Sequence, residues 1–259
     1  MFVLPIIQAR TNSSRLPGKI LKPFSTGLNT IDYVACALKA AGLDRIVLAT
    51  TDQLADDLLA KTYQDRLQVY RGSENNVLSR YTDVICKYQP DYVVRICADN
   101  PLLLEDGIRY LLDQIPANPR MSYLSFALHA KPSMKLPFGI FAELIKAQAL
   151  LDVAKSPTQL EVEHVTISLY DPGRNDFKLF DFEKVFFPVP ADLRFTIDTQ
   201  TDFDNVEAVL KKFPDMKFVD APTLKRIVEF VSTSEMIETM RLESSKSINS
   251  KNYSAGGNT

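Results

Sequence analysis

Short apolar runs rich in Val and Ile alternate with longer amphipathic segments through the first half of the chain, and this alternation limits the fold more than any other feature. Each short run predicts a buried strand, and each longer segment predicts a helix that crosses to the next strand. Strands joined in this way form a mostly parallel sheet with helices on both faces. We expect strands at Val3–Gln8, Arg45–Thr50, Leu67–Tyr70, Tyr92–Cys97 and Ser122–Phe126. We expect helices at Thr30–Ala41, Leu54–Tyr63, Asn76–Tyr88 (with Asn75 or Asn76 as the N-cap) and Glu105–Gln114.

The second half changes character at residues 129–181, where the stretch HAKPSMKLPFG has the composition of a loop. The patterns that follow predict helices near Ala142–Ala154 and Gln159–Tyr170, a last strand at Arg194–Ile197, and helices near Thr201–Lys212 and Thr223–Val231. We therefore expect one α/β domain over residues 1–240, a Rossmann-like sheet flanked by helices, with residues 129–181 as a protruding lobe. Residues 241–259 are polar and rich in Ser, Asn and Gly, which predicts a disordered tail.

The composition argues against several classes of partner. A formal net charge of −2 gives no overall field that would attract nucleic acid or an anionic membrane. No apolar stretch approaches the length of a membrane span, and the first residues lack a secretion-signal pattern. The three cysteines are an odd number and lie in apolar segments, which favours reduced, buried thiols. We expect a cytoplasmic protein without nucleic-acid or membrane partners.

An unopposed cationic loop follows the first predicted strand, in the stretch IIQARTNSSRLPGKIL. The loop holds Arg10, Arg15 and Lys19, and no Asp or Glu occurs before Asp32. Guanidinium and ammonium groups bind phosphate oxygens, while the loop serines and Gly18 leave backbone N–H groups accessible. The loop therefore predicts polyphosphate binding. The alternative is a solvated surface loop whose charges only aid solubility.

The common phosphate-binding and catalytic motifs are absent from the sequence. The basic loop is not a P-loop, because Ser13 stands where G-x-x-x-x-G-K-[ST] requires its first glycine, and no G-x-G-x-x-G occurs. His129 and His164 are the two histidines, and without C-x-x-C or H-E-x-x-H we expect no zinc site. A serine hydrolase triad is not expected either, because no G-x-S-x-G elbow occurs.

Two carboxylates, Asp99 and Asp198, directly follow apolar runs in VVRICADNPLL and RFTIDTQTDF. The carboxyl ends of parallel strands share one rim of the sheet, where ligands gather, so both should lie near the basic loop and Arg71. Paired carboxylates suit Mg²⁺, which takes few protein ligands and keeps water or phosphate oxygens. The alternative is that each aspartate caps the helix after it, and for Asp198 taken alone the cap is the favoured interpretation.

A series of motifs in this order resembles the spore coat polysaccharide biosynthesis (SpsF-type) cytidylyltransferases, relatives of the acylneuraminate and 3-deoxy-manno-octulosonate cytidylyltransferases. The resemblance spans about residues 2–209. The motifs are IIQARTNSSRLPGKIL, VLATTDQLADDLLA, VYRGSENNVLSRYTD, VVRICADNPLL, LPFGIFAELIKAQAL, EVEHVT and RFTIDTQTDF.

The resemblance implies a nucleotide-diphospho-sugar transferase fold and a reaction of CTP with a hydroxyl of a sugar acid, with Mg²⁺, that gives a CMP-sugar and pyrophosphate. It implies the following roles: Arg10, Ser13, Arg15 and Lys19 for the triphosphate; Arg71, Gly72, Ser73, Asn76 and Arg80 for cytosine and ribose; Asp99 and Asp198 for Mg²⁺; Glu143, Glu163 and His164 for the acceptor. Arg15, Lys19 and Asp99 are the candidate catalytic residues. From its helical pattern alone, His164 is more often a packing residue than a base.

Two departures from the family pattern leave alternatives open. Phe138 and Phe141 stand where polar or acidic residues are more usual, which predicts a more apolar acceptor pocket. The turn PFSTGLNTI replaces the usual Gly-Lys-Pro turn after the basic loop. The alternatives are a nucleotidyltransferase that acts on a sugar or polyol phosphate and makes a CDP-linked product, and a non-catalytic nucleotide-binding homologue. By analogy with related enzymes, a homodimer joined through the middle lobe is also expected.

Overall fold

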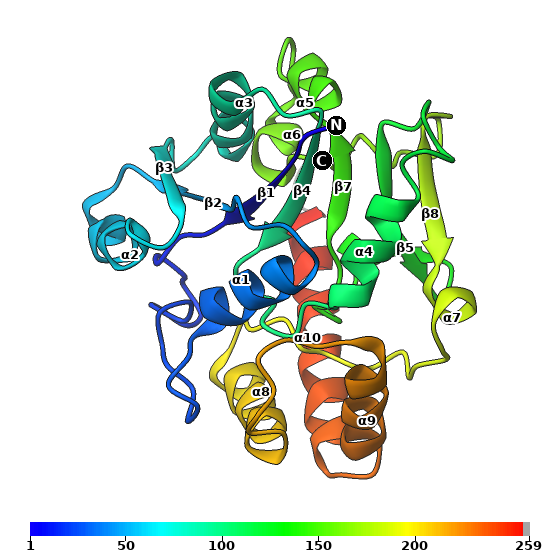
Figure 1. The fold of residues 1–259 in the computed structure, drawn as a ribbon. Helices are drawn as coiled ribbons and strands as arrows, with labels where there is room; N and C mark the ends of the chain where they lie inside the picture. Colours follow the sequence, from blue (N-terminus) through cyan, green and yellow to red (C-terminus); the bar gives the residue numbers. More distant parts are fainter. Residues whose placement is uncertain (256–259) are drawn as a thin grey trace.

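A mixed, mostly parallel sheet forms the centre of the protein, in a computed structural model that describes residues 1–255 and the side chains up to residue 245 (Figure 1). The strand order is β3-β2-β1-β4-β7-β5-β6, and β8 pairs with β5. The strands are β1 (Val3–Gln8), β2 (Val47–Thr51), β3 (Gln68–Gly72), β4 (Tyr92–Cys97), β5 (Tyr123–Leu128), β6 (Lys131–Pro132), β7 (Glu143–Lys146) and β8 (Phe177–Asp181). The predicted α/β class is confirmed.

The parallel half of the sheet aligns the carboxyl ends of three strands. β1 lies between β2 and β4, and its last residue, Gln8, is in register with Ala49 of β2 and Cys97 of β4. β2 pairs in parallel with β3 up to Thr51 and Gly72. The chain segments that leave these strands therefore begin on one rim, as the sequence predicts.

Helices cover both faces of the sheet because strand side chains alternate between two apolar cores. Ile7 and Leu48 belong to one core, whereas Ile6 and Val47 belong to the other. The first core is covered by α1 (Thr30–Ala40), α2 (Asp57–Tyr63) after a 3₁₀ turn (Leu54–Asp56), and α4 (Glu105–Asp113). The second is covered by α3 (Val77–Tyr88) and α5 (Ala147–Val153), and α6 (Gln159–His164) lies against α3 (Figure 1).

The C-terminal helices form a separate group beside the sheet (Figure 1). This group contains α8 (Gln200–Lys212), α9 (Ala221–Ser232) and α10 (Met236–Ala255), while the short α7 (Phe182–Val185) follows β8. Met240 of α10 is fully buried, and Thr239 donates a hydrogen bond to Asn205 of α8 at 3.1 Å. The structure therefore has a helix up to Ala255 where the sequence predicts a disordered tail from residue 241. The last part of that prediction, residues 256–259, lies outside the described residues.

The middle segment differs most from the sequence prediction. Residues 143–146, predicted as the start of a helix, form β7, which pairs antiparallel with both β4 and β5. β8 was not predicted and pairs in parallel with β5. β7 thus lies within the sheet rather than in a protruding lobe. A strand of four residues that runs directly into helix α5 gives no alternating pattern of its own, and its pairing is non-local.

Two other predicted elements are also revised. Arg194–Ile197 is not a strand but an irregular buried segment, in which Phe195 donates its backbone N–H to Pro137 and Ile197 donates to Asp99. Helix α6 ends at His164 rather than Tyr170, because Val165 adopts a φ of 21° that no α-helix continues. The Asn76 N-cap of α3 is confirmed by its 2.8 Å hydrogen bond from the Ser79 N–H.

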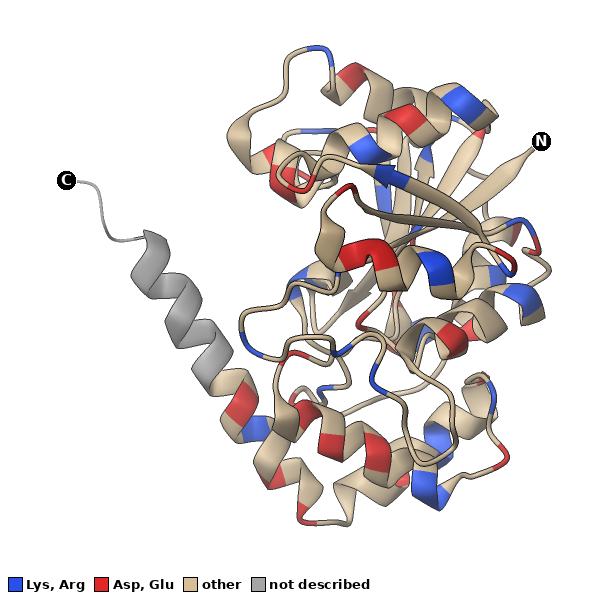
Figure 2. Cartoon of the chain, turned by 90° about the vertical axis from the view of Figure 1, so that its left-hand side faces the viewer, with Lys and Arg blue, Asp and Glu red and all other residues tan. Residues whose placement is uncertain are grey.

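The charges of the described residues are interspersed. Figure 2 shows acidic and basic segments side by side along the helices of one side of the molecule. The cations of the loop after β1 are therefore a local feature. Within residues 1–255, no helix combines the length and the apolar character that crossing a membrane requires.

Candidate active site

The basic loop after β1 is anchored to β2 by one buried carboxylate, Asp56. Asp56 accepts hydrogen bonds from the N–H (2.7 Å) and hydroxyl (2.5 Å) of Thr11, from the Thr50 hydroxyl (2.9 Å), and from the N–H (3.1 Å) and hydroxyl (2.5 Å) of Thr51. Burial raises the pKa of Asp56, but the hydrogen bonds from Thr11, Thr51 and Thr50 outweigh burial, and the net pKa is lowered. The first residues of the loop are thus fixed before any ligand binds.

Lys19 ends the same loop and joins it to the two predicted metal ligands. Its Nζ lies 3.1 Å from Asp99 Oδ2 and 3.2 Å from Asp198 Oδ1, and it donates to the Ile197 carbonyl at 2.5 Å. Burial lowers the pKa of Lys19, but Asp99 and Asp198 raise it by more, so the net pKa lies above its usual value. The loop cation and the two aspartates therefore converge, as the sequence predicts.

Asp198 is positioned by a buried ion pair behind it. Arg194, 1% exposed, donates to Asp198 Oδ2 at 3.0 Å and to Asp202 Oδ1 at 2.7 Å. Asp202 also accepts the backbone N–H groups of Asp198 and Thr199. Thr199, not Asp198, caps α8, so the cap interpretation of Asp198 is wrong. Burial raises the pKa of Asp198, but Lys19, Arg15 and Arg194 lower it by more. Asp198 is therefore ionised.

A tight backbone contact fixes the segment that presents Asp198. Gly139 has a φ of +71°, and a Cβ there would lie 2.5 Å from the Thr196 nitrogen. The Thr196 hydroxyl donates to Asn100 at 2.9 Å, and the Ile197 N–H donates to the Asp99 carbonyl at 2.9 Å. The chain around Asp99 and the chain before Asp198 are thus held side by side.

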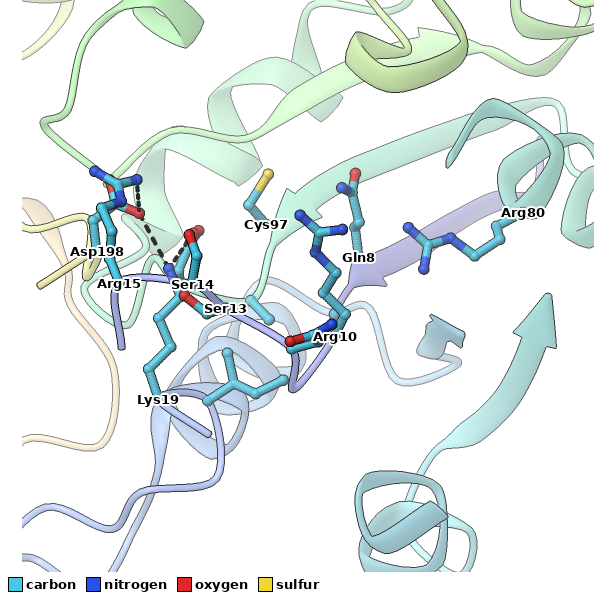
Figure 3. Close-up of a pocket in the computed structure, with 14 residues that line it drawn as sticks. Gln8, Arg10, Ser13, Ser14, Arg15, Lys19, Arg80, Cys97 and Asp198 are labelled. Atoms are coloured by element: carbon cyan, nitrogen blue, oxygen red, sulfur yellow. Dashed lines mark hydrogen bonds and ion pairs between the residues drawn. The ribbon is translucent and has the colours of Figure 1, made fainter. Parts of the chain in front are cut away.

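A cavity opens where these elements meet (Figure 3). The predicted site residues that line it are Arg10, Ser13, Arg15, Lys19, Arg80, Asp99 and Asp198. Ser14, expected in the basic loop for its accessible backbone N–H, also lines it, whereas Gln8, Asn12 and Cys97 line it and were missed. Gln8 and Cys97 are the last residues of β1 and β4, so their position at the strand ends was the signal that could have identified them.

Arg80 lies in the cavity wall without a partner. Its side chain is 1% exposed, and its Nε and Nη1 are buried and donate to no acceptor among the described residues. Burial lowers the pKa of Arg80 and neighbouring Arg10 lowers it further, while Tyr81, Asp56 and Glu74 raise it by less, so the net pKa is lowered. A buried guanidinium without an acceptor is costly, so this group requires an electron-rich ligand atom.

Four other residues expected at the nucleotide do not line the cavity. Arg71 donates to the Thr51 and Gln53 carbonyls and pairs with Asp57 at 2.7 Å, so it holds the β2–α2 connection. Ser73 and Asn76 hydrogen-bond within the α3 cap. Gly72 leaves space for Arg80, because a Cβ there would lie 3.1 Å from Arg80 Cγ.

The residues expected at the acceptor are also outside this cavity. Glu143 is fully buried and pairs with Arg95, while Glu163 and His164 are exposed on α6. Phe138 and Phe141 are buried, 1% and 5% exposed, and pack against Phe182. The prediction that these two rings make the acceptor pocket apolar is therefore wrong, because they form part of the core.

The cysteines are unpaired. Cys86 is exposed and Cys36 and Cys97 are half-buried, which corrects the expectation that all three thiols are buried. Asp99 and Asp198 offer carboxylate oxygens on one side of the cavity. Within the described residues no group of three or more His, Cys, Asp and Glu side chains could hold a metal ion. Two carboxylates with an open side fit Mg²⁺, whose remaining ligands are water and phosphate oxygens, and do not fit a closed structural metal site.

Comparisons with known proteins agree with this geometry. The sequence profile described as Cytidylyltransferase matches residues 4–240. The spore coat polysaccharide biosynthesis protein SpsF of Bacillus subtilis (strain 168) is 31% identical, over 86% of this chain and 92% of its own. The structure of a cytidylyltransferase from Leptospira borgpetersenii has a TM-score of 0.77 at 24% identity, over 92% of this chain and 96% of that chain.

The structure of CMP:2-keto-3-deoxy-manno-octonic acid synthetase complexed with CTP has a TM-score of 0.64 at 16% identity, over 82% of this chain and 99% of that chain. The two structural likenesses show a shared nucleotide-sugar transferase fold. The family profile covers nearly the whole described chain, including every residue of the cavity. This chain therefore belongs to the cytidylyltransferase family.

Proposed function

We propose that this protein is a cytoplasmic, CTP-dependent enzyme that transfers CMP to a hydroxyl of a sugar acid, releases pyrophosphate, and serves the synthesis of a surface polysaccharide or glycan. The proposal rests on one observation: Lys19, Asp99 and Asp198 meet beside a cationic loop at the rim of the sheet. The names of two similar proteins support the substrate class, since one is a spore coat polysaccharide biosynthesis protein and one a CMP-sugar-acid synthetase complexed with CTP.

The cationic loop provides the groups that would bind the triphosphate. Lys19 is buried and fixed by its two aspartates, so it supplies a positioned charge. The Arg15 side chain is 53% exposed and pairs with Asp198 at 3.0 Å, so it can turn towards a phosphate at small cost. Arg10 lies farther along the cavity (Figure 3). Forked guanidinium donors and a point charge together suit phosphate oxygens.

Asp99 and Asp198 are the residues that would hold Mg²⁺. When bound, the ion would neutralise charge on the phosphates and orient them for displacement. Arg194 and Asp202 keep Asp198 in place from behind, so the carboxylate does not need to be ordered by the ion itself.

The reaction is an in-line displacement at the α-phosphorus. The acceptor hydroxyl oxygen forms a bond to the α-phosphorus, and the bond from that phosphorus to the oxygen bridging the α- and β-phosphates breaks. Pyrophosphate leaves, and the hydroxyl proton passes to water. Arg15 and Lys19 stabilise the negative charge that grows on the leaving pyrophosphate.

The burial of Phe138 and Phe141 in the core removes the observation that favoured a non-catalytic protein. A CDP-linked product would form if the attacking oxygen belonged to a sugar or polyol phosphate, and mass spectrometry of the product distinguishes it from a CMP-linked one.

The expected homodimer is part of the proposal, and light scattering of the purified protein tests it.

The test is incubation of the purified protein with CTP, Mg²⁺ and a panel of nonulosonic and octulosonic acids, with pyrophosphate release and mass spectrometry as readouts. We expect a CMP-linked product that is lost with EDTA and in Asp99→Asn. The control is Asp44→Asn, which changes an exposed carboxylate at the amino end of β2, on the opposite rim. No pyrophosphate with any acid, together with no thermal shift from CTP, would overturn the proposal.

A further inference from the structure

The Gln8 carboxamide at the carboxyl end of β1 has a fixed orientation. Its Oε1 accepts from Arg95 Nη2 at 3.2 Å and from the Tyr81 hydroxyl at 3.3 Å. Because arginine can only donate, the atom that faces it must be the amide oxygen. Burial raises the pKa of Tyr81, so its hydroxyl keeps its proton and also donates. The amide nitrogen, which has no acceptor among the described residues, is left for a ligand in the cavity (Figure 3).

The Arg95 side chain is held in turn by a buried carboxylate, Glu143. Arg95 pairs with Glu143, its partner across β4 and β7, and Glu143 also accepts the Tyr123 hydroxyl at 2.8 Å. Burial lowers the pKa of Arg95, but Glu143 raises it by more, so the guanidinium stays charged. Glu143 is therefore a positioning residue that acts on the cavity through Arg95 and Gln8.

Arg80 faces the same part of the cavity from α3. In Figure 3 its guanidinium points towards Gln8 and Arg10, and Asp198 lies at the opposite end of the group of labelled residues. Arg80 lies in the first turn of α3, where the helix dipole disfavours a cation, and its Nε and Nη1 have no acceptor. Among the described residues, Tyr81, Asp56 and Glu74 offset the positive charge of Arg80 only in part. A ligand atom that accepts hydrogen bonds from the guanidinium would complete the compensation.

Three side chains present hydrogen-bond donors at this end of the cavity. Gln8 presents its NH₂ group, and Arg80 and Arg10 present guanidinium groups. Cytosine presents two adjacent acceptors, N3 and O2, whereas uracil presents an N3–H donor in the place of N3. Donors therefore match cytosine and oppose uracil.

We propose that Gln8 and Arg80 bind N3 and O2 of the cytosine base and so select CTP over UTP, with Arg95 and Tyr81 as positioning residues for Gln8. This inference rests on the proposed use of a cytidine nucleotide. A donor that faces another donor leaves both unpaired, which reduces affinity about 10- to 100-fold.

The test compares CTP and UTP in wild type and in Gln8→Glu, by calorimetric binding and by kcat/KM. The substitution keeps the shape but replaces the NH₂ donor by a carboxylate oxygen that accepts the uracil N3–H. We expect the CTP/UTP ratio to fall about 100-fold, with the melting temperature nearly unchanged. An unchanged ratio would overturn the inference even if CMP transfer is observed. A change in KM for the acceptor alone would also overturn it, because Gln8 would then face the acceptor.

The positioning role is tested with Tyr81→Phe, which removes one of the two donors that fix the Gln8 amide. We expect the CTP/UTP ratio to fall about 3- to 10-fold, since one hydrogen bond is worth about 1 kcal/mol. The control is Tyr33→Phe, which removes the hydroxyl of another buried tyrosine. Tyr33 lies on α1, outside the cavity, and its hydroxyl donates to Thr26. Equal effects of the two variants on the ratio, or no effect of Tyr81→Phe, would overturn the positioning role.

Discussion

Lys19 Nζ lies 3.2 Å from Asp198 Oδ1, although 179 positions separate the two residues in the chain. The same nitrogen also contacts Asp99 and the Ile197 carbonyl, so a single ammonium group joins the first loop to both carboxylates. Lys19 lies in the loop after β1, Asp99 follows β4, and Asp198 follows the irregular segment Arg194–Ile197, which is hydrogen-bonded to Asp99. The site is therefore assembled by the topology of the sheet rather than by any local motif.

The first prediction concerns Lys19→Met. Loss of this charge should reduce kcat on the order of 10²- to 10³-fold, because a fixed cation at the leaving phosphates disappears. Steady-state assay of CMP transfer measures the effect. Lys22→Met is the matched control, because Lys22 bonds Gln200 and touches neither aspartate. Comparable losses in the two variants would contradict a special role for Lys19.

The second prediction concerns Asp56→Asn. An amide cannot accept the five hydrogen bonds that Asp56 accepts from Thr11, Thr50 and Thr51, so the free energy of unfolding at pH 7 should fall by about 2–3 kcal/mol. Because the pKa of Asp56 is lowered in the folded state, its stabilisation is complete above the unfolded value of about 4. It is lost as the pH falls through the folded pKa.

Urea unfolding of wild type and Asp56→Asn from pH 7 to pH 2 tests this dependence. The stability difference should be constant down to about pH 4 and shrink below it. Asp65→Asn, at an exposed carboxylate after α2, is the control and should change stability by less than about 0.5 kcal/mol. A difference that grows towards low pH would contradict the lowered pKa.

The sequence was sufficient to predict strands β1 to β4 and the rim of the sheet at their carboxyl ends. The strands of this half repeat one unit, a Val- and Ile-rich run followed by an amphipathic helix, so local pattern and topology agree. Lys19, Asp99 and Asp198 were predicted correctly as neighbours, because the loop that holds Lys19 follows β1 and each aspartate follows an apolar run. The carboxyl ends of the parallel strands lie on one rim of the sheet, so the segments that follow β1 and β4 begin close together.

The remaining features depend on contacts that are distant in the chain. β7 is recognised as a strand only through its pairing with β4 and β5, and Arg95 and Glu143 are charged residues inside strands that otherwise read as apolar. Gln8 was missed because one polar residue at the end of a strand carries no periodic signal. Its partners, Arg95 and Tyr81, are 87 and 73 positions away.

The third prediction concerns Gly139→Ala. A left-handed φ costs an alanine about 1–2 kcal/mol, and the clash with Thr196 should add about 1–3 kcal/mol. The displaced segment precedes Asp198, so kcat should fall about 10²-fold. Gly42→Ala is the control, because Gly42 has a φ of +82° and nothing within 4 Å of the added Cβ. Gly42→Ala should lose only the about 1–2 kcal/mol that the left-handed φ costs an alanine, and it should keep full activity. Thermal unfolding and steady-state kinetics measure both, and equal kcat losses would contradict the argument.

The fourth prediction concerns thiol reactivity. The thiolate is the reactive form, and burial raises the pKa of Cys97 to about 11, so Cys97 should react slowly with iodoacetamide at pH 7.5. Exposed Cys86 should react first. As the pH rises towards 11, Cys97 should become reactive, and CTP with Mg²⁺ should then protect it because it lines the cavity. Peptide mass spectrometry follows the two cysteines separately, so Cys86 serves as the internal control. Cys97 labelling at pH 7.5 as fast as that of Cys86 would contradict the raised pKa, and labelling at high pH that CTP does not slow would contradict nucleotide binding beside Cys97.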